Sequence, residues 1–220
     1  VRQRLLERLA GHLLDGVSEE AARDAAQVAE WAPPTTLTAV LVPQAQLRPV
    51  LTAVSGATLA LPEAPGVEEA GLLLVPDAHG RGRGALLRAV EGREAVVGPA
   101  RPWLEVRASY DRVLRAHAAG LGPDTEAHLP ALVLDADAEA RADLRAQVLA
   151  PLADLRPAQA EKLTETLRAW LLHHGRREEV AAALFVHPQT VRYRMGQLRE
   201  LYGDGLEDPE SVLALTVALA

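Results

Sequence analysis

The sequence predicts an α+β protein in which a small α/β sandwich precedes an all-helical domain. Short runs of β-forming residues, separated by Gly and Pro, lie within residues 34–136. Helical patterns alternate with these runs, and from residue 137 onward the apolar periodicity is helical only. The expected boundaries are residues 1–33 for N-terminal connector helices, 34–136 for the α/β domain and 137–220 for the helical domain.

Two amphipathic helices are predicted at the N-terminus. Apolar residues at helical spacing, beginning with Val1, indicate a helix over residues 1–15 that stops at Gly16. Ser18 is typical of an N-cap, and the helix that it begins is expected to run to Trp31. The first helix is expected to be the end of a connector from a sensory region missing from this chain. Its leucine stripe suits either pairing with a second copy or packing on the α/β domain.

The α/β domain is expected to have the order βαββαβ, followed by a helix and a further strand. The predicted strands are Leu37–Val42, Ala57–Leu61, Gly71–Val75, Ala95–Gly98 and Ala131–Leu134. The predicted helices are residues 48–54, 83–91 and 109–119, the last capped by Ser109 and closed by Gly120. This order predicts a ferredoxin-like sandwich, with helices on one face of a mostly antiparallel sheet.

The helical domain is expected to contain five helices. Their predicted ranges are 138–154, 159–174, 176–184, 188–202 and 209–219. Pro188 and Pro209 suit the first positions of the last two helices, and Asp208 suits the N-cap of the final one.

Composition limits the functions that the chain can have. The net charge is −7, from 30 acidic and 23 basic residues, which argues against a surface coated with bases for non-specific nucleic-acid binding. The chain has no Cys, which excludes disulfides, thiolate nucleophiles and Cys-ligated zinc. The longest uncharged apolar stretch, Ser211–Ala220, is far shorter than the ~20 residues of a membrane span. We therefore expect a soluble, cytoplasmic protein without a membrane partner.

Residues 176–202 have the pattern of a helix-turn-helix. A short Ala-rich helix, a tight turn and a second helix that starts at Pro188 follow one another. Small side chains allow the two helices to cross closely, and Val186 is expected to fill the corner between them. Residues 187–199 contain three Arg and no acid, so positive charge is concentrated on the second helix of an acidic chain.

The second helix has a polar face suited to the major groove of DNA. At 100° per residue, Val191, Met195 and Leu198 share one face, and most of the polar residues lie opposite. Arg pairs with guanine, Gln with adenine, and Thr or Tyr with phosphate. The candidate DNA-contacting residues are Gln189, Thr190, Arg192, Tyr193 and Gln197, with His187 and Arg194 in support. Arg194 also suits a structural role, and the alternative for the whole motif is an ordinary helical hairpin with a solvated Arg face.

The C-terminal part of the chain resembles a known family. The matching residues are Leu163, Thr166, Leu167, Trp170, Leu171, the run Ala182–Met195, Leu201, Gly203, Asp208 and Pro209. They resemble the C-terminal helix-turn-helix domain of the PucR/CdaR group of bacterial transcription regulators, over about residues 140–220. Gln189 stands where the family more often has Asn, and Met195 where it usually has Leu. Residues 17–135 resemble, more loosely, the GGDEF-like domain that these regulators carry upstream.

The resemblance implies a sequence-specific DNA-binding regulator, usually an activator of catabolic genes. The implied partners are double-stranded DNA and a small-molecule effector, which acts through the missing N-terminal sensory region. A homodimer or higher oligomer is expected because one recognition helix contacts only a few base pairs.

An enzyme is the alternative function. Diguanylate cyclases share the scaffold that the resemblance implies for the α/β domain, and they need a Gly-Gly-Asp/Glu-Glu-Phe turn and a further carboxylate to hold Mg²⁺. The corresponding hairpin, residues 62–69, contains two Pro and no Gly-Gly pair. The sequence therefore predicts no cyclase or other nucleotide-binding enzyme, and no catalytic residue.

Three weaker patterns have structural explanations as well as functional ones. The Gly-Arg-Gly-Arg-Gly run at residues 80–84 suits a phosphate cradle at a helix N-terminus or a plain loop. The alternate carboxylates of residues 135–139 suit a metal site, or a strand end followed by an N-cap and a first helical turn. The adjacent His residues 173–174 suit the C-terminus of a helix better than a metal site, because neighbouring residues on a helix do not face each other. No cofactor or metal site is predicted.

Overall fold

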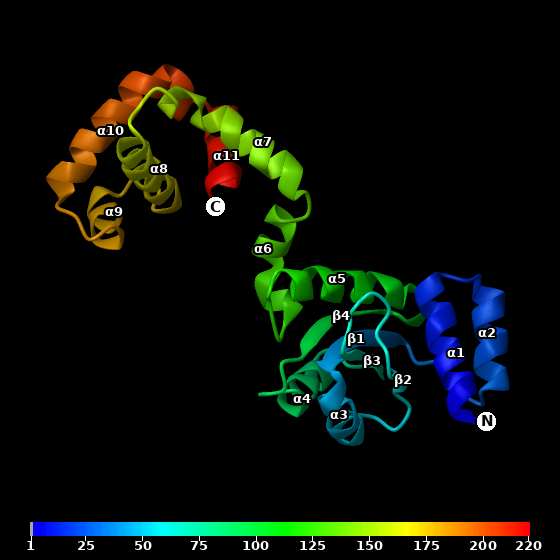
Figure 1. Cartoon of the computed structure of the whole chain (residues 1–220). Helices are drawn as coiled ribbons and strands as arrows, with labels where there is room; N and C mark the ends of the chain where they lie inside the picture. The colour runs from blue at the N-terminus through cyan, green and yellow to red at the C-terminus, as the bar shows by residue number, and fades with distance from the viewer. Residues whose placement is uncertain (1) are drawn as a thin grey trace. The chain divides into compact units, whose positions relative to one another are not determined.

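The computed structural model describes residues 2–220 and divides into two compact units, Val1–Leu132 and Val133–Ala220 (Figure 1). We call the first the sheet unit and the second the helical unit. Each unit has its own hydrophobic core, so each is described by itself. Val1, the first position of the predicted N-terminal helix, lies outside the described residues.

The sheet unit is built on a four-stranded antiparallel sheet. Its strands are β1 (Thr36–Pro43), β2 (Leu59–Leu61), β3 (Ala70–Pro76) and β4 (Val96–Pro102). They lie in the order β2-β3-β1-β4, and every neighbouring pair is antiparallel. The predicted βαββαβ order and the antiparallel sheet are confirmed.

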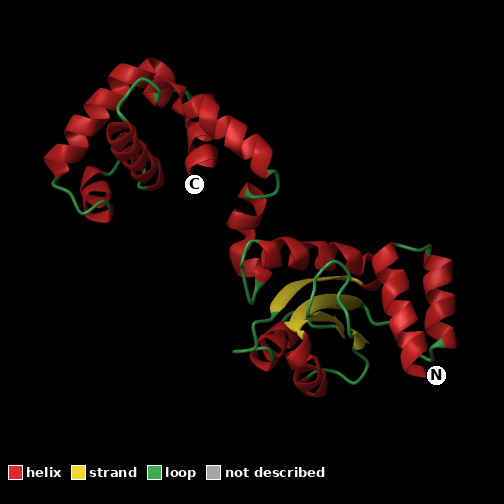
Figure 2. Cartoon of the chain, in the orientation of Figure 1, coloured by secondary structure: helices red, strands yellow, loops and turns green. Residues whose placement is uncertain are grey.

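Helices cover both faces of the sheet, so the prediction of helices on one face is wrong (Figure 2). On one face, α3 (Leu47–Ala53) and α4 (Arg81–Ala89) share a core with Val40. On the other face, α5 (Val106–Ala118) shares a core with Leu41. The reason is that β1 and β3 are apolar at nearly every position, and side chains of a strand alternate between its two faces. Strands of this composition need cover on both sides.

The fifth predicted strand, Ala131–Leu134, is wrong, because these residues lie in α6 (Leu129–Leu134). A short apolar run does not distinguish a strand from a helix by periodicity. The outer edge of β4 is partly covered by the irregular segment after α5, where the Val97 N–H donates to the Pro123 carbonyl at 2.7 Å.

The two N-terminal helices pack on the sheet unit. They are α1 (Arg2–Asp15) and α2 (Glu19–Val28). Ser18 caps α2 as predicted, since its hydroxyl accepts the Ala21 N–H at 3.3 Å. Leu9 and Leu13 are buried in the core on one face of the sheet. The leucine stripe of α1 therefore packs on the α/β domain, one of the two arrangements expected. α2 ends at Val28, before Trp31, whose side chain is buried in the same core.

Ser109 is not the N-cap of α5, because the helix begins at Val106 and Ser109 lies inside it. Its buried hydroxyl accepts the backbone N–H of Ala39 in β1 at 3.0 Å, which ties the helix to the sheet. Gly98 of β4 lies against the same residue. A Cβ at Gly98 would lie 2.5 Å from the Ser109 hydroxyl and 2.8 Å from its carbonyl oxygen. The close approach of α5 to β4 therefore depends on a residue without a side chain.

Replacing Gly98 with alanine is expected to lower the free energy of unfolding of the sheet unit by about 1–3 kcal/mol, because the added methyl overpacks a site bounded by backbone. Urea denaturation measures the change. Gly56→Ala is the matched control, since nothing lies within 4 Å of a Cβ built there. Equal losses in the two variants would contradict this explanation.

The helical unit contains the five predicted helices. They are α7 (Ala138–Leu149), α8 (Pro157–Leu172), α9 (Arg177–Ala183), α10 (Pro188–Tyr202) and α11 (Pro209–Leu219). The first is shorter than predicted and continues as a 3-10 helix.

The 3-10 helices among the described residues are Gln44–Gln46, Trp103–Glu105, Thr125–His128, Ala150–Leu152 and Gly203–Leu206. Among residues 2–220, no helix is both long enough and apolar enough to span a membrane.

Candidate nucleic-acid interface

The turn between α9 and α10 is fixed by backbone hydrogen bonds. The N–H of Val186 donates to the Ala181 carbonyl at 3.0 Å, and the N–H of Phe185 donates to the Ala182 carbonyl at 3.2 Å. This pair of bonds is the Schellman arrangement that closes a helix C-terminus. Phe185 occupies its left-handed position, with φ of 53°. The turn therefore has one defined conformation.

Small and apolar side chains hold the two helices together. Val180 and Ala181 of α9 are buried, and so is Val191 of α10. Val186 packs against the core of the helical unit from the turn, as expected for the residue at the corner. Because small residues let helices approach closely, this packing gives α10 a fixed position on α9.

The start of α10 is capped by the first of the predicted DNA-contacting residues. The Nδ1 atom of His187 accepts the backbone N–H of Gln189 at 3.2 Å, and Pro188 occupies the first helical position. Proline suits that position because its missing N–H has no partner within the helix. His187 therefore stabilises the start of α10, and its side chain is also exposed to solvent.

The seven predicted DNA-contacting residues lie at the start and on the exposed side of α10, except Arg194. His187, Gln189, Arg192 and Tyr193 are exposed, and Tyr193 is 67% exposed. The remaining three are half-buried: Thr190, Arg194 and Gln197. The Gln197 amide donates to the Tyr193 hydroxyl at 3.4 Å, which couples two neighbours on the exposed side.

The three arginines of α10 have different surroundings. Arg194 donates to the hydroxyl of Thr166 in α8 at 3.2 Å. The Arg199 guanidinium lies over the ring of Trp170, 5.7 Å from its centroid, a contact that the sequence analysis did not identify. Arg192 is exposed and makes no hydrogen bond or ion pair with any part of the described chain. Its guanidinium is therefore available to a partner.

Within residues 176–202, the acidic residues lie on α9 and at the end of α10. The Glu179 carboxylate accepts a hydrogen bond from the Arg176 guanidinium at 2.5 Å, and its other oxygen lies 3.4 Å from Nδ1 of His173. The hydrogen bond from Arg176 holds the pKa of Glu179 below its ordinary value. The first carboxylate on α10 is Glu200, two turns after Arg192. The first half of α10 therefore presents positive charge without a competing acid.

Residues 80–84, the Gly-Arg-Gly-Arg-Gly run, make contacts with other residues of the sheet unit. Its helix, α4, begins at Arg81 with Gly80 as N-cap, two residues earlier than predicted. The Arg83 guanidinium pairs with Asp124 and donates to the Gly98 carbonyl at 2.9 Å. Burial alone raises the pKa of Asp124, but hydrogen bonds from Arg83 and from the Glu126 N–H outweigh it and lower the pKa below 3.8.

Because the folded-state pKa of Asp124 is depressed, its stabilising contribution is present above pH 3.8 and is lost as the pH falls through the lower folded value. We expect the difference in unfolding free energy between the wild type and Asp124→Asn to narrow below pH 3.8. Denaturant titrations over this range measure it, with exposed Asp24→Asn as control. A difference that stays constant with pH would contradict the assignment.

Residues 62–69, considered for cyclase activity, and the carboxylates of residues 135–139, considered for metal binding, make structural contacts. The loop at residues 62–69 joins β2 to β3, and the Tyr110 hydroxyl donates to the Pro65 carbonyl in it. Asp137 is the N-cap of α7, as predicted, but Asp135 follows helix α6 rather than a strand and pairs with Arg141 at 2.9 Å. Within residues 2–220, no group of three His, Cys, Asp or Glu side chains is arranged to hold a metal ion.

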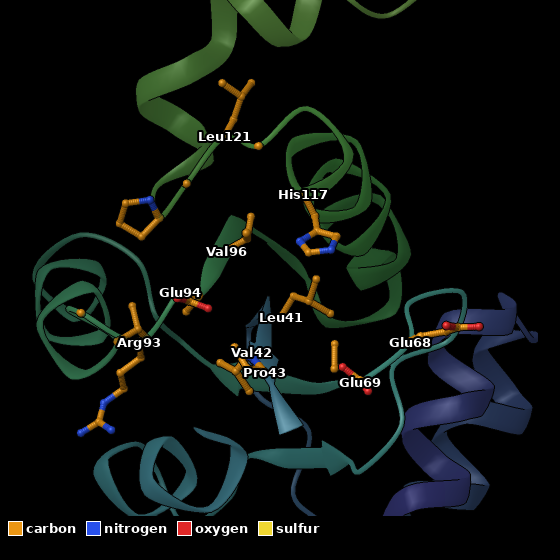
Figure 3. A pocket seen from close by; sticks show the side chains of 17 residues that line it. Leu41, Val42, Pro43, Glu68, Glu69, Arg93, Glu94, Val96, His117 and Leu121 are labelled. Carbon is orange, nitrogen blue, oxygen red and sulfur yellow. The ribbon is translucent and has the colours of Figure 1, made fainter. Parts of the chain in front are cut away.

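The sheet unit also contains an open hollow of about 540 Å³, at the end of the sheet where β1 finishes (Figure 3). Leu41 and Val96 lie at its centre, and the His117 ring faces them. Arg93 points away, and its guanidinium donates to the Gln46 side chain at 2.9 Å. None of the charged residues that line the hollow is buried, so it has no buried charged group that would select a ligand.

Comparison with known proteins finds a family match within the helical unit. Residues 163–220 match the PucR C-terminal helix-turn-helix domain. A Thermomonospora curvata protein, described as an uncharacterized protein in the pkwA 5' region, is 40% identical over 110 residues, which are 49% of this chain and 59% of that protein. The purine catabolism regulatory protein of Bacillus subtilis is 41% identical over 59 residues, which are 27% of this chain and 11% of that protein.

A likeness in structure is found to the crystal structure of a regulator of polyketide synthase expression from Bifidobacterium adolescentis. The TM-score is 0.46 at 21% sequence identity, and the alignment covers 99% of this chain and 96% of the other.

The helical unit therefore contains a helix-turn-helix domain, the class of domain that binds DNA. This domain, residues 163–220, is similar to the C-terminal domain of PucR-type regulators. The chain spans about three fifths of the length of its Thermomonospora relative and about a tenth of the Bacillus regulator.

Proposed function

We propose that this chain is a sequence-specific DNA-binding transcription regulator that places α10 in the major groove. The observation that carries the proposal is the exposed face of α10, which is polar, bears the uncommitted Arg192 and has no acid before Glu200. The major groove admits a helix, and its base edges offer hydrogen-bonding groups that such a face complements. The fixed turn from α9 limits the freedom that α10 would lose on binding.

The seven candidate residues divide into three roles. Gln189 and Arg192 are the proposed base contacts, because amide and guanidinium groups pair with base edges in two-bond geometry. Thr190, Tyr193 and Gln197 suit base or phosphate contacts from the same side. His187 orders the helix start, and Arg194 holds α10 against α8 through Thr166, so both support the contact surface.

The proposals on gene targets, oligomeric state and effector rest on the similarity to PucR-type regulators. We propose that the protein activates catabolic genes, acts in the cytoplasm as a homodimer or higher oligomer, and responds to a small effector through a region outside this chain. Purine catabolism appears in the name of the Bacillus relative, which supports a catabolic target. The boundaries proposed for the functional parts are residues 1–33, 34–136 and 137–220.

For residues 34–136 we propose a degenerate GGDEF-like domain that relays signals through contacts rather than catalysis. The turn at residues 62–69 has no Gly-Gly pair, and its backbone is tied to α5 by Tyr110. We expect no GTP turnover in the presence of Mg²⁺, and turnover above a protein-free blank would support the enzyme alternative.

The test of DNA binding is selection from a pool of duplexes with a randomised centre. The full chain is incubated with the pool, and bound duplexes are recovered, amplified and sequenced over several rounds. We expect one motif to be enriched, with two half-sites about 10 base pairs apart if two copies bind side by side. A pool that remains random, with the protein shown to be folded by circular dichroism, would contradict the proposed function.

A further inference from the structure

Phe185 has no packing role in the free protein. It is the one Phe in the sequence, and at 97% exposure it is the most exposed large apolar side chain among the described residues. Its neighbours Leu184 and Val186 both pack against the core of the helical unit. A large apolar side chain contributes to stability through the area that it buries, and Phe185 buries almost none.

The backbone at Phe185 also disfavours a large residue. With φ of 53°, this position lies in the left-handed region, which glycine adopts without strain and other residues adopt at a cost. Glycine is the usual residue at this position of a Schellman turn. Phe185 therefore costs folding free energy in its backbone and recovers none by burial.

Phe185 lies close to the start of the proposed recognition helix. Only two residues separate it from Pro188, so the two Cα atoms are at most about 11 Å apart. In helix-turn-helix proteins the first residues of the recognition helix contact base edges. The acid-free stretch of residues 187–199 begins two positions after Phe185. The ring is therefore at the edge of the surface proposed to meet DNA.

We propose that Phe185 is a DNA-contacting residue, whose ring packs on the duplex at the edge of the groove that α10 enters. The apolar groups that a duplex offers there are the C5-methyl of thymine and the carbons of deoxyribose. This inference rests on the proposed function, and it adds an apolar contact to the polar and charged ones of α10. The duplex supplies the burial that Phe185 lacks in the free protein.

The test compares Phe185→Gly with Phe185→Tyr, using the motif enriched from the randomised pool as the duplex. For Phe185→Gly we expect about a 10-fold loss of affinity, the order of magnitude for losing part of one buried aromatic contact. Its thermal unfolding midpoint should equal or exceed that of the wild type, because glycine relieves the left-handed backbone. Phe185→Tyr keeps the ring and should bind within about 2-fold of the wild type.

The salt dependence separates this contact from a charged one. Loss of an apolar contact should leave the slope of log K against log salt concentration unchanged, whereas loss of a phosphate contact lowers it by about 1. Wild-type affinity in Phe185→Gly, combined with weakened binding in Arg192→Ala, would overturn this inference alone. So would a Phe185→Gly variant with a lowered unfolding midpoint and no rescue by tyrosine, since that result indicates a structural role.

Two further outcomes are distinguishable. If Phe185→Gly binds the duplex like the wild type but loses activity in run-off transcription with RNA polymerase, the partner of Phe185 is a protein, and the DNA contact is overturned. If the wild type enriches no motif at all, the proposed function fails, and this inference fails with it.

Discussion

Replacing Arg192 with alanine is expected to weaken binding to the selected duplex about 10- to 100-fold, or about 1–3 kcal/mol, with relaxed preference at one base pair. Arg192 is exposed and is the one arginine of α10 not engaged by Thr166 or Trp170. Its removal costs no internal hydrogen bond or ion pair, so the unfolding midpoint should not change. Fluorescence anisotropy at several salt concentrations measures both the affinity and the salt slope.

Arg156→Ala is the matched control for this experiment. Arg156 is also an exposed arginine of the helical unit, but it precedes α8 and lies outside the helix-turn-helix. We expect its substitution to leave affinity within about 2-fold, since it removes a charge that lies outside the helix-turn-helix. If Arg192→Ala binds with unchanged affinity and an unchanged salt slope, α10 does not contact DNA through this residue, and its assignment as the recognition helix is wrong.

Replacing Leu198 with alanine is expected to lower the unfolding free energy of the helical unit by about 2–5 kcal/mol. Leu198 lies on α10 and is fully buried, in the core that also contains Leu163, Leu167 and Leu215. The substitution leaves a cavity beneath the proposed recognition surface without changing an exposed group. DNA affinity should therefore fall together with stability and recover partly at lower temperature.

Leu213→Ala is the control for the cavity. Leu213 is 65% exposed on α11, so its truncation should change the unfolding free energy by less than about 0.5 kcal/mol. Chemical denaturation of both variants makes the comparison. Similar losses at the two positions would contradict the assignment of α10 as a core-packed helix.

The helical unit could be predicted from sequence more accurately than the sheet unit. The bounds of α10 and α11 follow from proline at the first helical position and from polar or apolar periodicity, which are local signals. The short run Ala131–Leu134 has no such signal, and it became a helix. Ser109 looks like an N-cap in sequence, yet it is buried inside α5, because its hydroxyl bonds to a strand 70 residues away. Contacts of that range are not visible in local pattern.

The sequence predicts which residues form the candidate site, but it does not predict the surroundings of each side chain. The helical wheel placed Arg194 near the buried face, and the structure gives it a partner in α8. The contact of Arg199 with Trp170 and the exposure of Phe185 depend on how helices cross, which the wheel does not describe. Because Arg194 and Arg199 have partners within the helical unit, Arg192 is the arginine of α10 that we propose contacts DNA.

We propose that α10 makes this chain a sequence-specific DNA-binding protein. The most direct test is the ratio of affinities of the full chain for the enriched duplex and for a scrambled duplex of the same base composition, at one fixed salt concentration near 0.15 M. We predict a ratio of at least about 10³, as is typical of specific regulators. Equal affinity for the two duplexes would show binding by charge alone and would contradict sequence-specific recognition by α10.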